Sequence, residues 1–315
     1  MKNKLRYLFI IFLIIIVSIF IVNFTNKNIK KNNKRIIIDE KNSNNYVKKK
    51  KKEKNDEVGK DKTLSKIIEE IIDQECGNLE GDWQVAVDSL GGDFDISIYK
   101  SSNSKIESLP SASTIKIFLA LETYRQVEGD ILDEKNVEND IYLMLKDSNN
   151  ESANRLIDLI GNYDMDISSQ KINKTIKNIT GENTTGLYRK MLHEGKENMA
   201  SARDLNMALS DIYFGNFVNK VHSKKMMEAM AENNTTSKFK LLGNLPKEAK
   251  GYSKSGEIPD KGVENDIAII SIGDKVFAIS FLSQYPNPLS HGQGPQFTCM
   301  QNLGQRISEA FMEYE

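Results

Sequence analysis

The sequence predicts an α/β fold of the α+β type, in which one antiparallel sheet is closed by the two ends of a globular body and a helical layer is inserted between them. Three observations lead to this prediction. Alternating apolar residues near the start of the body indicate a hairpin, three more strand patterns lie near its end, and helical spacing fills the stretch between. With 315 residues and 39% hydrophobic side chains, the chain can bury one large core or two small ones.

The body begins with a predicted helix and a predicted hairpin. Residues 63–76 carry isoleucines at helical spacing, after a threonine and a serine that can cap a helix. The strand patterns at 83–87 and 94–99 lie on either side of Gly91 and Gly92, a pair typical of tight turns. We therefore expect these two strands to pair antiparallel.

The rest of the body is predicted to form helices and then strands. Helical spacing predicts four helices, at 113–127, 137–146, 151–160 and 202–214. The end of the chain is predicted to form three strands and a last helix, at 251–258, 266–272, 276–282 and 298–312. If the first and last helices pack on one face of the sheet, Cys76 and Cys299 become neighbours, and a disulfide and two buried thiols both remain open.

The segment before the body differs from it in charge. Residues 1–62 carry a net charge of +11 and residues 63–315 a net charge of −12, which together give the −1 of the whole chain. An acidic body argues against nucleic acid as a partner, because phosphate binding requires clustered lysine and arginine.

The N-terminal segment also has an apolar stretch. Residues 7–24 are almost wholly apolar and, as a helix, would span roughly 27 Å, near the thickness of a hydrocarbon core. No small-x-small cleavage site follows, so we interpret residues 1–24 as a membrane anchor; a cleaved signal peptide, which would release the body, is the alternative. Residues 25–62, rich in lysine and asparagine, are predicted to be a basic flexible stalk, and residues 63–315 the folded domain. Basic residues on both sides of the anchor leave its orientation open.

The first candidate for chemistry is Ser113, which precedes Lys116 by three residues at the start of a predicted helix. This spacing places both side chains on one helical face, where the lysine amine can reach the serine hydroxyl. A serine needs a neighbouring base to become a nucleophile, and burial in the apolar run after Lys116 would lower the lysine pKa enough for that role. The motif is short and recurs in this chain, so it requires support from other residues.

Two further motifs supply that support. Ser148 begins a Ser-Asn-Asn turn between two predicted helices, where its hydroxyl could pass a proton to a leaving group and Asn150 could hold a substrate amide. The same sequence is also an ordinary helix cap. In a predicted strand, Lys254 and Ser255 offer a cation and a hydroxyl to a carboxylate, and Gly256 would let an extended substrate approach closely.

Taken in order, the three motifs resemble the S-x-x-K, S-D-N and K-T-G set of class A β-lactamases and related penicillin-binding proteins, over residues 63–315. The resemblance includes Pro110 before the first serine, the stretch 151–154 after the second motif and the stretch 265–268 after the third. It implies a serine β-lactamase-like fold, with a five-stranded antiparallel sheet packed by the N- and C-terminal helices and an inserted helical subdomain.

The resemblance also implies a role for each motif residue. The catalytic residues would be Ser113 as the acylated nucleophile, Lys116 as its base and Ser148 as the proton shuttle. The residues implied for substrate binding are Asn150, Lys254, Ser255 and Glu257. Glu257 would act through its backbone N–H, which forms an oxyanion hole with the N–H of Ser113. Because the enzymes that the chain resembles meet their substrates outside the cytoplasmic membrane, the resemblance implies an extracytoplasmic domain on a single-pass anchor.

The chain departs from the family pattern in the residues that should release the product. Residues 185–191 match the family's loop up to the position of the deacylating glutamate, where this chain has Met191. A thioether cannot activate water, so release of the acyl-enzyme is expected to be atypical unless Glu182, Glu194 or Glu197 takes over. Asparagine also replaces the usual aspartate at the centre of the second motif.

Three functions agree with these observations. The first is a membrane-anchored serine hydrolase that opens β-lactams, the second a penicillin-binding DD-peptidase or transpeptidase that acts on cell-wall peptide, and the third a non-catalytic binding module of the envelope. A Ser-His-Asp hydrolase is disfavoured because the chain has no G-x-S-x-G, and a metallohydrolase because its three histidines are scattered without an H-E-x-x-H. We expect no cofactor, no metal and a monomer.

Overall fold

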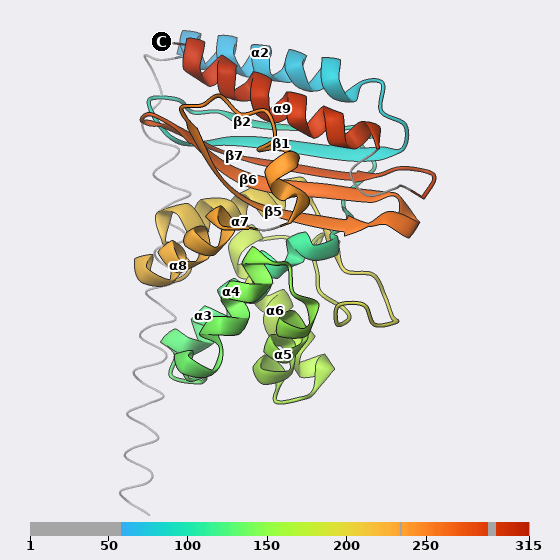
Figure 1. Cartoon of the computed structure of the whole chain (residues 1–315), viewed down its shortest axis with the longest axis vertical. Coiled ribbons are helices and arrows are strands. Elements are labelled where there is room, and N and C mark those ends of the chain that lie inside the picture. The colour runs from blue at the N-terminus through green and yellow to red at the C-terminus, as the bar shows by residue number, and fades with distance from the viewer. Residues whose placement is uncertain (1–57, 234, 289–293, 315) are drawn as a thin grey trace, which may run out of the picture. The chain divides into compact units, whose positions relative to one another are not determined.

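A five-stranded antiparallel sheet lies at the centre of the structure, a computed structural model that describes residues 58–233, 235–288 and 294–314 (Figure 1). The strand order is β2-β1-β7-β6-β5. The strands are β1 (Asp82–Gly91), β2 (Ser97–Ser101), β5 (Ala249–Ile258), β6 (Val263–Ile272) and β7 (Lys275–Gln284). Because β1 pairs with β7, the early hairpin and the late strands close one sheet, and the predicted fold class is confirmed.

The first and last helices cover one face of this sheet (Figure 1). They are α2 (Val58–Cys76) and α9 (Pro295–Glu313), whose apolar side chains form one buried cluster with those of β1, β6 and β7. Cys76 and Cys299 lie in this cluster as free thiols with their Sγ atoms 3.4 Å apart. The hydrogen bond to Cys299 and burial both raise the pKa of Cys76. The two cysteines are thus neighbours, as expected.

The N-terminal predictions fall mainly outside the described residues. This applies to the anchor at 1–24 and to most of the stalk. Residues 58–62, which the sequence analysis assigned to the stalk, are instead the first residues of α2, because adding polar residues to an existing helix costs little. Over the described ranges, no helix has the length and apolar character needed to cross a bilayer.

Six helices form the layer inserted between the hairpin and the late strands (Figure 1). They are α3 (Lys116–Glu128), α4 (Glu138–Lys146), α5 (Asn150–Gly161), α6 (Met165–Thr180), α7 (Ala202–Phe214) and α8 (Lys220–Ala231). The sequence did not predict α6, which is rich in lysine, serine and asparagine, or α8, which is rich in lysine and methionine. Their start signals were nevertheless present, because Asp164 and Asn219 cap them through their side chains.

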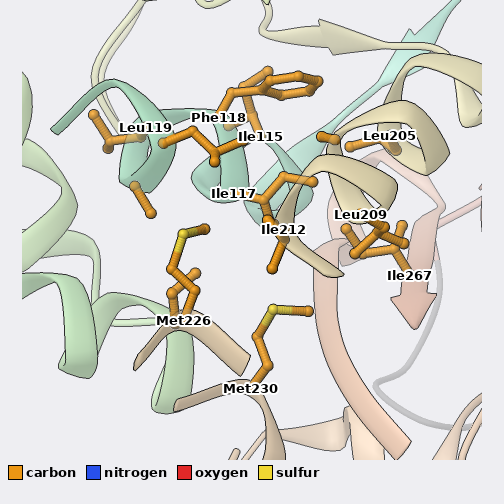
Figure 2. Close-up of a cluster of buried hydrophobic side chains, with 14 of the residues drawn as sticks. Ile115, Ile117, Phe118, Leu119, Leu205, Leu209, Ile212, Met226, Met230 and Ile267 are labelled. Atoms are coloured by element: carbon orange, nitrogen blue, oxygen red, sulfur yellow. The ribbon is translucent and has the colours of Figure 1, made fainter. Parts of the chain in front are cut away.

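The helical layer shares its core with the second face of the sheet. Figure 2 shows side chains of α3, α7 and α8 in one cluster with Ile267 of β6. Ile117, Phe118 and Leu119, directly after Lys116, are all fully buried. The apolar run after Lys116 therefore provides the burial that the sequence predicted.

A short turn connects the sheet side of the molecule to α3. The two-residue strand β3 (Leu109–Pro110) pairs with β4 (Met199–Ala200) and leads into the 3₁₀ helix η1 (Ala112–Ile115), from which α3 continues. Ser113 therefore lies in this 3₁₀ turn, just before the regular helix that the sequence predicted from that residue. Ala112, immediately before Ser113, has a φ of 47°, a left-handed conformation that is uncommon for a residue other than glycine.

Candidate active site

The hydroxyl of Ser148 connects two buried lysine amines. Lys254 Nζ donates to Ser148 Oγ over 2.8 Å, and Lys116 Nζ lies 3.3 Å from the same oxygen. Both lysine side chains are fully buried, Lys116 at the start of α3 and Lys254 in β5. The fold therefore brings one residue of each motif to a single oxygen atom.

Lys116 is held mainly by carbonyl-type acceptors. Its Nζ donates to the backbone oxygen of Ser148 and to Oδ1 of Asn150, each over 2.7 Å. A neutral amine has two N–H donors and one lone pair, so these two bonds use both donors and leave the lone pair available for a proton. Burial, and to a lesser extent the positive charge of Lys254, lowers the pKa of Lys116 to about 6. At neutral pH the amine is therefore mostly neutral and can act as a base.

One expected contact is not formed. No hydrogen bond joins Lys116 Nζ to Ser113 Oγ within the described part of the chain, although the two residues are one turn apart. The amine bonds the carbonyl and hydroxyl oxygens of Ser148 and Oδ1 of Asn150 instead. Proton transfer from Ser113 thus requires the hydroxyl to rotate or the amine to shift toward it.

The second motif is held by the start of α5. Asn149 caps this helix, with its side-chain oxygen accepting from the Ser152 N–H over 2.8 Å, and Ser148 before it adopts a left-handed φ of 54°. Asn150 is then the first helical residue, and its side chain points to Lys116. The asparagine that replaces the usual aspartate therefore acts as a cap, and it places its two neighbours beside the lysine.

The third motif presents its residues on two faces of β5. Lys254 and Gly256 lie on the face toward the helical layer, whereas Ser255 and Glu257 lie on the other, since strand side chains alternate. Burial lowers the pKa of Lys254 to about 7, although the charge of Asp266 opposes this shift. Lys254 is therefore partly charged at neutral pH.

Gly256 is packed against residues 111–114, which carry the predicted nucleophile Ser113 and are called the nucleophile turn below. A Cβ atom at Gly256 would lie 2.8 Å from Ser111 O, 2.8 Å from Ser113 N and 2.9 Å from Thr114 N. The space beside this glycine is thus filled by protein backbone. The expectation that Gly256 makes room for a substrate is corrected accordingly, because it makes room for the turn that carries Ser113.

The side chains of Ser255 and Glu257 have partners in the segment after α8. Ser255 Oγ donates to Thr235 Oγ1 over 3.3 Å, and the Glu257 carboxylate accepts from the fully buried Lys240 over 2.8 Å. Lys240 also lies 2.7 Å from Glu264, a buried carboxylate on the neighbouring strand. The proposed contact between Ser255 and a substrate carboxylate stays a prediction, as does the use of the Glu257 backbone N–H.

The loop between α6 and β4 lies beside the nucleophile turn. Asn198 near its end accepts both the N–H and the hydroxyl of Ser111 through its backbone oxygen, at 2.8 and 3.1 Å. The side chain of Asn198 bonds the backbone of Tyr188 and Arg189 inside the loop. A loop with such internal bonds is ordered rather than loosely attached.

Met191 occupies a buried place in this loop. Its backbone N–H and carbonyl both bond the side chain of Asn154 on α5, at 2.8 and 3.1 Å, and its side chain, only 6% exposed, belongs to the main apolar core. Asn154 lies one helical turn after Asn150, the acceptor for Lys116. The thioether is therefore buried in the core, and the backbone of Met191 is fixed to the helix that begins with Asn150.

The three glutamates considered as replacements are not at this place. Glu182 and Glu194 are exposed. Glu197 bonds Arg189 and Lys261 at 2.5 and 2.7 Å. Burial raises the pKa of Glu197, but these two cations lower it further, so that the pKa lies below its usual value. None of the three bonds Ser113, Lys116 or Ser148, and no group of metal-binding side chains is found in the described ranges.

The sequence match to a known family agrees with this geometry. A model of the β-lactamase enzyme family matches residues 133–311, more than half of the chain. The chain belongs to the β-lactamase enzyme family. The matched region contains the second and third motifs and begins after Ser113 and Lys116. The prediction of a β-lactamase-like serine hydrolase is thereby confirmed.

Solved structures share the β-lactamase fold. PBP-A is 16% identical with a TM-score of 0.65, and the match covers 79% of this chain and 97% of that one. A β-lactamase from Sphaerobacter thermophilus is 18% identical with a TM-score of 0.60, covering 79% and 96%. One from Burkholderia vietnamiensis is 13% identical with a TM-score of 0.64, covering 80% and 97%. At these identities the likeness shows the fold alone, and no curated protein matches the chain in sequence.

Three asparagines of the candidate site were not predicted from the sequence to have a role. Asn154 holds Met191, Asn198 holds the loop and Ser111, and Asn265 of β6 donates to the backbone before Ser113. A buried amide must find partners, so an asparagine inside the apolar strand β6 was a usable signal. Which backbone groups it binds could not be read from the sequence.

Substituting Gly256 with alanine is expected to damage the site and the fold together. The added methyl would meet three backbone atoms, so we expect a loss of about 1–3 kcal/mol of stability and about a 10- to 100-fold slower acylation of Ser113. Denaturant unfolding and single-turnover acylation measure the two effects. Gly129→Ala is the control, since its nearest neighbour is at 3.4 Å. Wild-type acylation in Gly256→Ala would show that the close packing does not position Ser113.

Acylation is also expected to have a bell-shaped pH profile. Because Lys116 must be neutral to accept a proton, the rate increases with pH up to about 6, by about tenfold per unit below that value. Lys254 loses its charge as pH increases through about 7, so attraction of a substrate carboxylate weakens above it. The second-order acylation rate constant, measured from about pH 4.5 to about pH 9, checks both limbs. A rate that is flat below about pH 6 would exclude Lys116 as the base.

Proposed function

We propose that this protein is a membrane-anchored, extracytoplasmic serine hydrolase that forms an acyl-enzyme at Ser113 with β-lactams and releases it slowly. The observation that carries the proposal is the Ser148 hydroxyl between Lys116 and Lys254, at 3.3 and 2.8 Å. A serine held between two amines of lowered pKa can move a proton in either direction.

Acylation can be written with these groups. Ser113 Oγ bonds to the β-lactam carbonyl carbon while its proton passes to the neutral amine of Lys116. The backbone N–H of Ser113 would stabilise the oxyanion together with that of Glu257. When the ring C–N bond breaks, Ser148 gives its proton to the leaving nitrogen and regains one from Lys116. The amine is thereby returned to its neutral form, and Ser113 carries the opened ring as an ester.

Slow release follows from the residues around Met191. Hydrolysis of the ester requires a group that takes a proton from water within hydrogen-bond reach, and Met191 cannot do so. One of the similar solved structures is a leucine-to-glutamate variant of PBP-A in an acyl-enzyme complex with penicillin G. That protein is 15% identical to this chain, and the existence of its complex supports the use of penicillin G as a probe here.

The cellular location is part of the proposal. Residues 7–24 are apolar over a membrane-spanning length, and the basic stalk after them would keep the domain near the membrane surface. β-Lactams and cell-wall peptides are both met outside the cytoplasmic membrane. Fractionation with a protease applied to intact cells tests the location, and protection of residues 63–315 would contradict it.

A cell-wall peptide is the second candidate substrate, because β5 is the last strand of the sheet. An extended peptide can add to such an edge through backbone hydrogen bonds, beside Lys254 and Ser113. The enzyme would then act as a DD-peptidase or transpeptidase through the same acyl-enzyme. A non-catalytic module is disfavoured, since two fully buried lysines around one serine would be costly without a chemical role.

A labelled penicillin is expected to modify the purified domain covalently at Ser113. Peptide mass spectrometry locates the adduct, and Ser113→Ala abolishes it. The lifetime of the adduct then separates the candidates, since persistence over hours supports the proposed slow release and turnover within seconds identifies an efficient β-lactamase. No adduct at high reagent concentration would refute acylation by β-lactams. An adduct in Ser113→Ala would show that another residue is the nucleophile.

Met191→Glu alone is not expected to create fast turnover. The new carboxylate would enter a core position that is 6% exposed, and residues 192–195 after it lack the leucine-asparagine pair that accompanies the glutamate in the family. We expect the deacylation rate constant to change by less than about tenfold, with Met191→Gln as the uncharged control. A much larger increase, confined to the glutamate variant, would show that the missing carboxylate is the whole cause of slow release.

A further inference from the structure

Asn265 is a buried amide between the sheet and the nucleophile turn. It lies in β6, directly opposite Gly256 of β5 in the strand pairing, and it is 0% exposed. Its side chain lies on the same face of the sheet as Gly256, the face that meets the turn before α3. Gly256 has no side chain and leaves space for the turn, whereas the side chain of Asn265 reaches the turn.

The orientation of the Asn265 amide is determined by its partners. Its Oδ1 accepts from the backbone N–H of Ser283 in β7 over 2.9 Å, which only an oxygen can do. Its Nδ2 therefore points to the turn, where it donates to the carbonyls of Pro110 and Ser111 at 2.9 and 3.2 Å. One side chain thus connects a central strand to the two residues that precede Ala112.

The turn needs such support because its backbone is strained. Ala112 has a φ of 47°, a conformation that costs an alanine free energy and persists only when the surroundings hold it. Ser111 before it is fully buried, its N–H is fixed by Asn198, and its carbonyl also accepts from the Thr114 hydroxyl over 2.7 Å. The carbonyl side of the peptide before Ala112 is therefore held by Asn265 together with Thr114.

We propose that Asn265 is a positioning residue for acylation, which holds Ala112 in its left-handed conformation and so aims the hydroxyl and the N–H of Ser113 at the substrate carbonyl. The inference rests on the proposed function of Ser113. Asn265 does not act on the reacting atoms; it acts through the carbonyls of Pro110 and Ser111. Its loss should therefore slow the chemical step and leave the initial binding of the β-lactam unchanged.

Two variants and one matched control test this proposal. Asn265→Ala removes the donor and the acceptor, and Asn265→Asp keeps the acceptor for Ser283 but loses the two N–H donors. Asn206→Ala is the control, because Asn206 is a similarly buried amide that bonds Ser280 of β7, a strand separated from β5 by β6. Stopped-flow acylation by labelled penicillin separates the binding constant from the acylation rate constant.

We expect both Asn265 variants to lower the acylation rate constant by about 10- to 100-fold at neutral pH with an unchanged binding constant. Asn206→Ala should lower the melting temperature but leave the rate constant within about twofold of wild type. If all variants lose the same amount of melting temperature and keep the wild-type acylation rate constant, Asn265 has only a structural role. Asn265→Asp carries the test if Asn265→Ala does not fold.

The pH dependence of the acylation rate constant is a further measurement, and it would be the same in all variants if Asn265 had only a structural role. A protonated aspartic acid can donate one hydrogen bond to a carbonyl, and burial raises the pKa of such a group. The ratio of the Asn265→Asp rate constant to that of wild type should therefore increase as pH falls to about 5, while the ratio for Asn265→Ala stays constant. Parallel ratios would contradict the donor role.

Amide hydrogen exchange tests the positioning role of Asn265 separately from the proposed function. If wild type is not acylated, the proposed function fails, and amide exchange in the peptide 109–118 still measures whether Asn265 holds the turn. We expect faster exchange of this peptide in Asn265→Asp and an unchanged rate in Asn206→Ala. Unchanged exchange in both Asn265 variants would overturn the positioning role.

Discussion

The backbone contact between Gly256 and the nucleophile turn is the constraint on which the rest of the site depends. A Cβ at Gly256 would lie within 2.9 Å of three backbone atoms of residues 111–114, so strand and turn meet without any side chain between them. Backbone cannot adapt as side chains do, and the contact therefore sets where α3 begins. Since Lys116 is the first residue of α3, its amine enters the site from a position that the sheet itself determines.

The two buried lysines are the groups through which this packing affects the chemistry of the site. Removing an ammonium group from water is costly, and the fold reduces the cost by lowering the pKa of both amines and by surrounding them with oxygen acceptors. Ser148 and Asn150 provide these acceptors for Lys116 because the cap of α5 lies directly between them. The same interactions thus stabilise the buried amines and make Lys116 available as a base.

The two halves of the acyl-enzyme reaction depend on different parts of the molecule. In the proposed reaction, acylation uses groups on η1, α3, the α4–α5 turn and β5, which are held by hydrogen bonds across the sheet and helical layers. In the proposed reaction, deacylation depends on the loop between α6 and β4, where Met191 is fixed by Asn154 within the apolar core. A chain can therefore keep the first half-reaction intact while its loop provides no group for the second.

The sequence by itself determined the five strands of the large sheet, the helices α2, α3, α4, α5, α7 and α9, and the motif residues, because alternation, helical spacing and short motifs are local properties of the chain. It did not reveal α6 and α8, whose apolar residues are buried against α5, α7 and β5 in the folded chain. Nor did it reveal that Lys116 bonds Ser148 rather than Ser113, or what lies beside Gly256 and Asn265. These contacts join residues far apart in the chain, such as Lys254 and Ser148 with a separation of 106. Only the tertiary structure decided them, because they depend on how closely the helical layer packs on the sheet.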